Sequence, residues 1–194
     1  MSISLVKGQK ISLAKQDGSS LSKIFLGAGW DVAKSGGMFG LFGGGNKSID
    51  LDVSVITFDA NKKQLDNVYF GQLRSRDGSI VHSGDNLTGA GEGDDEVIHV
   101  DLSQVPSNVQ SIVFTISSFR GQTFDEVENA FCRIVDQSNK ELAIYKLNEK
   151  GSHTGVLISS LKRNGGAWDF TARGLACRGR MVNDMIPQIT AEIL

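Results

Sequence analysis

The sequence contains few of the residues that build disulfide frameworks or transition-metal centres. Its 194 residues include only two cysteines and three histidines. Cys132 and Cys177 are far apart and form no CxxC pair, which argues against a disulfide scaffold and favours a reducing compartment. No histidine has a partner at the spacing typical of zinc or copper ligands, so a site for these metals is not expected.

Strong net charge and long apolar runs are also missing. The 20 Lys and Arg residues nearly balance the 22 Asp and Glu residues, which gives a formal net charge of −2. Such a chain has no long-range field for nucleic acid or anionic lipid, so neither is an expected partner. No apolar run approaches the roughly 20 residues of a membrane helix, and the first residues do not form a signal-peptide pattern. These absences predict a cytoplasmic protein without direct membrane insertion.

The sequence does contain many short segments with a period of two. Gly occurs 23 times and Pro only 2 times, so Gly, Asn, Asp and Ser mark the turns. The predicted strands are Lys10–Leu13, Lys23–Leu26, Ile49–Phe58, Asn67–Leu73, Val97–Leu102, Ser111–Ser117, Cys132–Asp136, Glu141–Leu147, Gly155–Leu161 and Trp168–Ala172. Short strands separated by turns are typical of a β-sandwich. We therefore expect residues 1–194 to form one all-β domain, a sandwich of two antiparallel sheets.

Two segments have the pattern of short peripheral helices. In Thr123–Phe131, the threonine can cap a first turn that carries two acidic residues, with apolar side chains on one face. In Asn183–Ile193, apolar residues follow the spacing of a helical stripe, and Pro187 would bend or shorten the helix. The second segment predicts a C-terminal helix.

A glycine-rich segment, GGMFGLFGGG, precedes one of the predicted strands. It is not a phosphate-binding P-loop, because Asn46 occupies the lysine position and a strand follows instead of a helix. We expect residues 36–47 to form a mobile loop between two strands. In the alternative interpretation, its Met and Phe side chains dock on a partner.

The most informative absence is that of basic residues from an acidic stretch. Seven acids and no Lys or Arg lie between Arg76 and Arg120, and residues 83–102 read SGDNLTGAGEGDDEVIHVDL. Like charges at this density repel one another unless water or a cation separates them. The stretch therefore requires a counter-charge from outside it.

Three chemistries use clustered carboxylates. A glycosidase pair needs a cleft lined by aromatics, of which the chain has only 7%, and a transition-metal site needs His or Cys. The third possibility is a site for a hard cation, because Ca²⁺ accepts six to eight oxygens from carboxylates, amides and carbonyls. The stretch is not an EF-hand, since Leu87, Gly89 and Ala90 occupy positions where that loop requires acids and a glycine. A solvated acidic loop without metal is the alternative.

A second source of carboxylates lies upstream. In IDLDVSVITF, Asp50 and Asp52 are two residues apart on a predicted strand, so they project from the same face while the apolar residues reach the core. Two adjacent carboxylates on a strand are costly unless a cation neutralises them. If the acidic loop folds over this strand end, the two groups can enclose one or two Ca²⁺ ions.

These residues resemble the motifs of the TerD family, the tellurium-resistance and stress-response proteins of bacteria. GDNLTGAGEGDDE at residues 84–96 matches the family pattern GDN-x-TG-x-G-[DE]-GDDE at every fixed position. The resemblance extends over nearly the whole chain, through LVKGQKISL, GAGWD, DLDVS, SFRGQTFDEVENAFCRIVD, GSHTG and WDFTARG. Leu87 and Ala90 differ from many members, which carry a basic and an acidic residue there.

The resemblance implies a β-sandwich that binds two Ca²⁺ ions and has no established enzymatic activity. It also implies complexes with other proteins of the tellurium-resistance operon near the inner membrane, including a membrane-spanning partner. Carried over by motif, the metal residues are Asp31, Asp50, Asp52, Asp85, Asn86, Gly89, Gly91, Glu92, Gly93, Asp94, Asp95 and Glu96. The glycines supply flexibility that lets backbone carbonyls point inward.

Two classes of function are compatible with the sequence. The first is a Ca²⁺-binding scaffold that docks partners in stress resistance. The second is a metal-dependent hydrolase or nuclease, which would need a Lys or Arg beside the acidic cluster, for example Arg74, Arg76 or Arg120. Direct reduction of tellurite is disfavoured, because the two cysteines lack the signature of reactive vicinal thiols.

Overall fold

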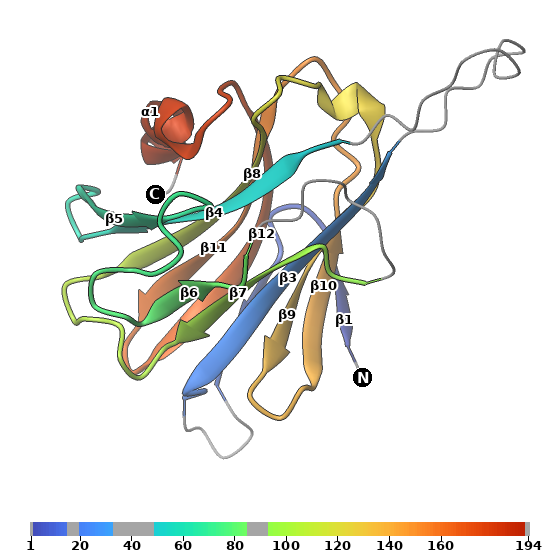
Figure 1. Cartoon of the computed structure of the whole chain (residues 1–194). Helices are drawn as coiled ribbons and strands as arrows, with labels where there is room; N and C mark the ends of the chain where they lie inside the picture. The colour runs from blue at the N-terminus through green and yellow to red at the C-terminus, as the bar shows by residue number, and fades with distance from the viewer. Residues whose placement is uncertain (1, 15–19, 33–48, 85–92, 193–194) are drawn as a thin grey trace, which may run out of the picture.

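The fold is a sandwich of two six-stranded sheets, seen in a computed structural model that describes residues 2–14, 20–32, 49–84 and 93–192. The β3 sheet has the order β1-β10-β9-β3-β7-β6, and the β4 sheet has the order β2-β12-β11-β8-β4-β5 (Figure 1). The strands are β1 (Ile3–Leu5), β2 (Lys10–Ser12), β3 (Lys23–Val32), β4 (Leu51–Phe58), β5 (Gln64–Val68), β6 (Ile80–His82), β7 (Glu96–Asp101), β8 (Ser111–Ser118), β9 (Val127–Asp136), β10 (Glu141–Lys146), β11 (Gly155–Asn164) and β12 (Ala167–Cys177). The all-β sandwich predicted from the sequence is confirmed, whereas the predicted loop at residues 36–47 lies entirely outside the described residues.

The sheets differ from the prediction in three strands and one pairing. The sequence pattern did not reveal β1 or β6, which have three residues each and are too short for a clear period of two. The predicted strand Asn67–Leu73 is wrong after Val68, where β5 ends, because Tyr69 and Gln72 exchange backbone hydrogen bonds of 3.1 and 2.8 Å across a tight turn. The β1–β10 pair is parallel, so the β3 sheet is not purely antiparallel.

The predicted helix at Thr123–Phe131 is wrong beyond its first turn. A 3-10 helix, η1, covers only Phe124–Glu126, where the Thr123 N–H donates to Glu126 Oε1 at 3.3 Å. The chain then continues as β9, which pairs with β3 on one side and β10 on the other. Two ladders of backbone hydrogen bonds therefore override the local helical pattern.

The core lies between the sheets. In β4, Leu51, Val53 and Val55 are fully buried in it, as the alternating pattern predicts. Cys132 on β9 is also fully buried there, and burial raises the pKa of its thiol to about 12. This thiol therefore stays protonated at neutral pH, as expected for an inert packing residue.

The predicted C-terminal helix is confirmed as α1 (Val182–Glu192), which packs on the outer face of the β4 sheet (Figure 1). Its residues Val182, Met185 and Ile189 form a second apolar cluster with side chains of β4, β8 and β11. Gly155 permits this close approach, because a Cβ there would lie 2.3 Å from Met185 Sδ. Within the described part of the chain, no helix has the length and apolar character of a membrane span.

Candidate metal-binding site

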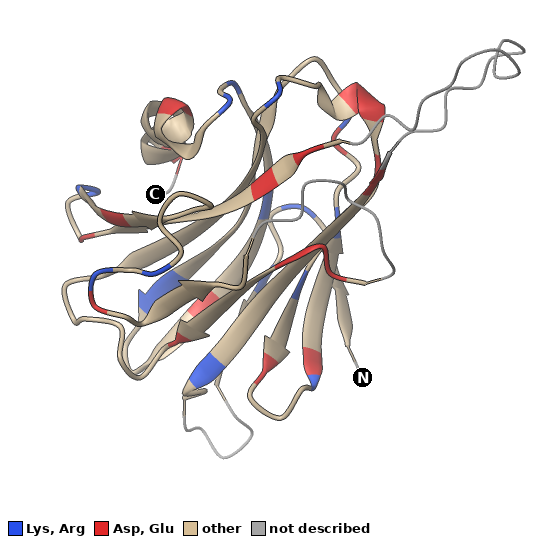
Figure 2. Ribbon diagram, in the orientation of Figure 1, with Lys and Arg blue, Asp and Glu red and all other residues tan. Residues whose placement is uncertain are grey.

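The structure describes seven of the twelve residues predicted as a metal site. These seven are Asp31, Asp50, Asp52, Gly93, Asp94, Asp95 and Glu96. The other five, Asp85, Asn86, Gly89, Gly91 and Glu92, lie outside the described residues. Most of the described carboxylates lie near one end of the sandwich, where β3 ends and β4 and β7 begin (Figure 2).

Asp50 and Asp52 lie at the beginning of β4, on the face opposite the core residues of that strand. Both are buried, with exposed fractions of 5% and 6%. Arg120, at the end of β8, pairs with Asp50 through Nε and Oδ2 at 3.0 Å. The second oxygen of Asp50, Oδ1, is buried and has no hydrogen-bond partner among the described residues. A buried carboxylate oxygen of this kind is costly unless a donor or a cation reaches it.

Asp94 has its counter-charge on β9, far from the acidic stretch in sequence. Arg133 Nε and Nη2 donate to the two carboxylate oxygens of Asp94, both at 2.8 Å, and Nη1 donates to Glu141 at 3.3 Å. Hydrogen bonding to Asp94 is the main cause that raises the pKa of Arg133 above its ordinary value. The carboxylate lies directly over Gly27 of β3, where a Cβ would come within 2.2 Å of it. A bidentate pair of this geometry fixes Asp94 on the outer face of the β3 sheet.

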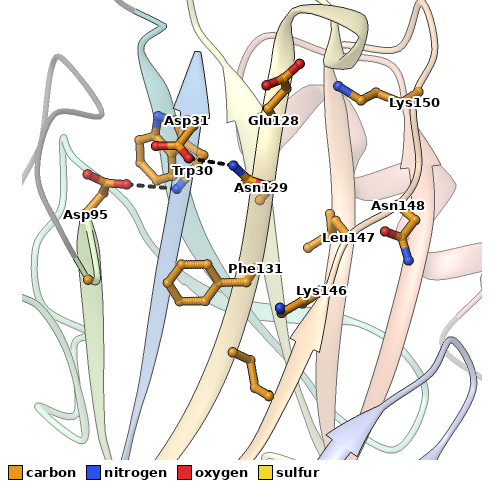
Figure 3. A pocket seen from close by; sticks show the side chains of 13 residues that line it. Trp30, Asp31, Asp95, Glu128, Asn129, Phe131, Lys146, Leu147, Asn148 and Lys150 are labelled. Atoms are coloured by element: carbon orange, nitrogen blue, oxygen red, sulfur yellow. Dashed lines mark hydrogen bonds between the residues drawn. The ribbon is translucent and has the colours of Figure 1, made fainter. Parts of the chain in front are cut away.

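Asp95 and Asp31 lie at the end of β3. Asp95 Oδ2 accepts a hydrogen bond from the Trp30 N–H at 2.9 Å, and Asp31 Oδ2 accepts one from Asn129 Nδ2 at 2.8 Å (Figure 3). Burial raises the pKa of Asp95 above its ordinary value, and the charges of Asp31 and Asp94 raise it further, while the Trp30 hydrogen bond opposes the shift. A cation near these carboxylates would relieve that repulsion.

Glu96 points into the sandwich. Only 1% of it is exposed, and its Oε2 accepts a hydrogen bond from the Val53 N–H at 2.8 Å, which ties β7 to β4. His82 Nε2 lies 3.2 Å from the same oxygen, and the Gly84 N–H donates to His82 Nδ1 at 3.1 Å. Because Nδ1 accepts, the ring carries its proton on Nε2 and can donate it to Glu96. His82 is therefore a packed histidine.

A hollow of about 700 Å³ opens beside Asp31 and Asp95 on the outer side of the β3 sheet. The start of β9, the end of β10 and the residues just before β7 also line it (Figure 3). The backbone at Gly93 contributes to the wall, and Gly29 lets it approach, because a Cβ on Gly29 would lie 2.6 Å from the Gly93 carbonyl oxygen. The Asp31 and Asp95 carboxylates and the Gly93 backbone therefore lie together on one side of the hollow.

The described carboxylates do not form a single cluster. Asp50 and Asp52 lie on the outer side of the β4 sheet, Asp31, Asp94 and Asp95 on the outer side of the β3 sheet, and Glu96 between the sheets. Among residues 2–14, 20–32, 49–84 and 93–192, no group of three or more His, Cys, Asp or Glu side chains could together hold a metal ion. The sequence did not identify Arg133 or Trp30 as partners of these acids, because their proximity depends on the pairing of β3 with β9 and β7.

The fold and these carboxylates define a two-sheet β-sandwich with an acidic end, and the comparisons with known proteins identify its family. Residues 1–186 match the TerD domain, and the chain belongs to the TerD family. This confirms the resemblance inferred from the GDNLTGAGEGDDE motif.

Several relatives align over nearly the whole chain. Tellurium resistance protein TerZ of Serratia marcescens is 56% identical over 192 residues, which cover 99% of each chain. Stress response protein SCP2 of Bacillus subtilis is 42% identical over 198 residues, covering 96% of this chain and 98% of its own. A crystal structure of a TerD homologue from Streptomyces coelicolor A3(2) superimposes with a TM-score of 0.68 at 21% identity, over 84% of this chain and 95% of that one, which supports the fold.

Proposed function

We propose that this chain is a non-enzymatic, Ca²⁺-binding interaction module in bacterial tellurite and general stress resistance. Its family is named for tellurium resistance and stress response. Calcium binding, the scaffold role and the location of the protein are the parts that go beyond family membership.

The observation that carries the calcium proposal is the buried, unbonded Oδ1 atom of Asp50. It lies beside the buried Asp52, and Arg120 engages only the other oxygen of Asp50. Hard oxygen donors held at a strand end match the preference of Ca²⁺ over that of zinc or copper. A bound Ca²⁺ would supply the positive charge that the Oδ1 atom lacks.

The separation of the carboxylates fits two ions better than one. Asp31, Asp95 and the backbone at Gly93 lie together at the hollow, on the opposite outer side of the sandwich from Asp50 and Asp52. The residues Asp85, Asn86, Gly89, Gly91 and Glu92 complete the proposed ligand set from the family motif. Asp94 and Glu96 belong to it on the same basis, although Asp94 would have to exchange Arg133 for the ion and Glu96 would have to exchange Val53 or His82.

An exposed aromatic patch supports the interaction role. The rings of Phe70 and Phe119 pack edge to face with centroids 5.8 Å apart, and they are 37% and 48% exposed. Leu73, which is 44% exposed, follows in the same turn region. Exposed apolar clusters of this type mark interaction sites, and Phe119 directly precedes the Arg120 that pairs with Asp50. We propose that this patch docks another tellurium-resistance operon protein, including a membrane-spanning one that brings this cytoplasmic protein to the inner membrane.

Isothermal titration calorimetry tests the calcium proposal. Wild-type protein stripped with chelator is titrated with Ca²⁺, first alone and then in excess Mg²⁺. We expect binding of two ions that Mg²⁺ competes with weakly, and a loss of one binding event in Asp50→Asn. Glu192→Gln, an exposed acid at the end of α1, is the matched control. Absence of any calcium heat, or an Asp50→Asn isotherm equal to that of wild type, contradicts the proposal.

One observation favours the hydrolase alternative, namely the guanidinium of Arg120 at 3.0 Å from Asp50. A cation beside metal-binding carboxylates can stabilise a developing negative charge. Phosphoester hydrolysis by protein loaded with Ca²⁺ or Mg²⁺, abolished by both Asp50→Asn and Arg120→Gln, would establish that alternative. The scaffold proposal expects no hydrolysis.

A further inference from the structure

The hollow on the β3 sheet has an aromatic wall in addition to its carboxylates. Phe131 of β9 and Ile144 of β10 line it. Gly29 of β3 makes this possible, because a Cβ there would lie 2.6 Å from the Phe131 ring. The ring therefore lies over β3 and gives the hollow a flat apolar surface, while its volume of about 700 Å³ is in the range of small-molecule sites.

The charged groups of the hollow are separated by sign. Asp31 and Asp95 stand on one side of Phe131, and Lys146 stands on the other (Figure 3). Glu128 and Lys150 line the hollow near its upper end in this view, and the Lys150 ammonium group donates to the Val127 carbonyl. Three acids against two lysines leave one net negative charge. The hollow is therefore complementary to a ligand with a net positive charge and a second, anionic end.

The strand order sets the span that such a ligand must cover. Asp31 is on β3 and Lys146 is on β10, with β9 between them. Lys146 is level with Phe131 and Gly29, and Asp31 lies two residues further along β3. Two inter-strand steps of about 10 Å and two residues of about 7 Å along the strand separate the two backbones by about 12 Å. A hydrogen bond at each end takes up about 3 Å, so the ligand needs a stem of several bonds between its two charged groups.

We propose that this hollow binds a basic amino acid or a similar small zwitterion, whose guanidinium or ammonium group lies between Asp31 and Asp95 and over Phe131 while its carboxylate pairs with Lys146. A planar cation is attracted both to the carboxylates and to the aromatic face. The carboxylate of the ligand gives Lys146 a partner. The ligand would compete with Ca²⁺ for Asp31 and Asp95, whereas Phe131 and Lys146 have no role in the calcium proposal, so the site goes beyond it.

The probes are L-arginine and two analogues that each lack one charged group. Agmatine retains the guanidinium and lacks the carboxylate, and L-citrulline retains the carboxylate and lacks the side-chain charge. Binding to full-length protein is measured by amide chemical-shift titration in the presence of chelator. We expect L-arginine to bind, with shifts centred on Phe131 and Lys146, and each analogue to bind at least about tenfold more weakly, because each loses a charge-assisted hydrogen bond.

Two variants with matched controls assign the contacts. Lys146→Gln should make L-arginine and agmatine bind equally, whereas Lys140→Gln, in the turn before β10, should leave their difference intact. Phe131→Leu should weaken both guanidinium ligands by about two- to fivefold through loss of the aromatic face. Phe25→Leu, on the same side of the sheet beside His99, should not.

Failure of this proposal is distinguishable from failure of the calcium proposal. The titrations contain chelator, so they do not depend on bound calcium, and calcium calorimetry is run separately on the same variants. The ligand proposal is overturned if L-arginine and L-citrulline bind equally, if no probe causes shifts at the hollow, or if Lys146→Gln leaves discrimination unchanged in a protein that still melts cooperatively.

Discussion

Arg133 neutralises Asp94 with two hydrogen bonds of 2.8 Å, so part of the counter-charge of the acidic stretch comes from the protein itself. The pair joins a residue just before β7 to the middle of β9, across β3. Only 8% of the Asp94 side chain and 33% of the Arg133 side chain are exposed. The geometry is therefore closer to a buried bidentate pair than to a surface salt bridge.

Replacing this arginine is expected to lower the stability of the metal-free protein and to raise its affinity for calcium. In chelator, Arg133→Met should reduce the free energy of unfolding by about 1–3 kcal/mol, because the largely buried Asp94 carboxylate loses its hydrogen bonds to Arg133. If Asp94 is a calcium ligand, the same variant should bind Ca²⁺ more tightly, because the competing cation is gone. Urea unfolding and calorimetry measure the two effects.

Lys23→Met is the control for a surface pair. Lys23 contacts Asp101 at 3.4 Å, but 65% of its side chain is exposed. This variant should change stability by only a few tenths of a kcal/mol. An Arg133→Met variant no less stable than Lys23→Met would show that the bidentate pair contributes little to folding.

Calcium is expected to stabilise the folded protein. The carboxylates are assembled only in the folded state, so at a free ion concentration of 100 times the dissociation constant each bound ion should add about 2.7 kcal/mol. Asp52→Asn should lose the gain from the ion at Asp50 and Asp52, so its melting temperature in Ca²⁺ should lie between those of wild-type protein with Ca²⁺ and in chelator. Differential scanning calorimetry with and without Ca²⁺ checks this, and an equal wild-type melting temperature in both buffers argues against the metal site.

The raised pKa of Asp95 predicts how its contribution to stability depends on pH. A carboxyl group whose folded-state pKa is above its unfolded-state pKa binds protons more tightly when folded, so its contribution falls as the pH rises from the ordinary value of 3.8 through the folded-state pKa. In chelator, Asp95→Asn should therefore gain stability relative to wild type as the pH rises through this window. Asparagine retains a side-chain oxygen that can accept from the Trp30 N–H.

Asp101→Asn is the control, because its effect on stability should change with pH in the opposite direction. Hydrogen bonding from Ser103 lowers the pKa of Asp101, so this carboxylate stabilises the folded state above its ordinary pKa, and that contribution disappears as the pH falls through the folded-state value. Its replacement should therefore cost stability at neutral pH and cost less in acid. Urea unfolding at a series of pH values compares the two variants, and parallel pH profiles for both would contradict the assignment.

The two thiols are expected to be unreactive and dispensable. Burial raises the pKa of Cys177 as well as that of Cys132, and neither is part of a disulfide. Thiol-specific reagents should therefore label native protein far more slowly than urea-unfolded protein. The double variant Cys132→Ala and Cys177→Ala should retain any tellurite resistance that the wild-type protein confers on cells, provided that it stays folded. Loss of resistance with an unchanged fold and calcium affinity would indicate thiol chemistry.

The sequence predicted the elements whose pattern is set by burial. In β4, the alternation of core and outward residues follows from one face contacting the core, so the placement of Asp50 and Asp52 could be derived from it. The sequence could not show that Arg120 and Arg133 would lie beside the acids, because these contacts depend on the register of strands distant in sequence. The segment after Thr123 was misassigned for the same reason, since pairing on both sides outweighs the local helical pattern.

The backbone hydrogen bonds of Ser83 and Asp95 limit the conformational entropy that calcium binding must overcome. Residues 85–92 connect two positions that are already held, because Ser83 N–H donates to the Val97 carbonyl and Asp95 N–H donates to the Ala28 carbonyl. Loop-closure entropy for this connection is therefore lost on folding and not on metal binding. Lengthening this connection should consequently lower the free energy of unfolding slowly, with the logarithm of its length, and leave the loop-closure part of the calcium affinity unchanged.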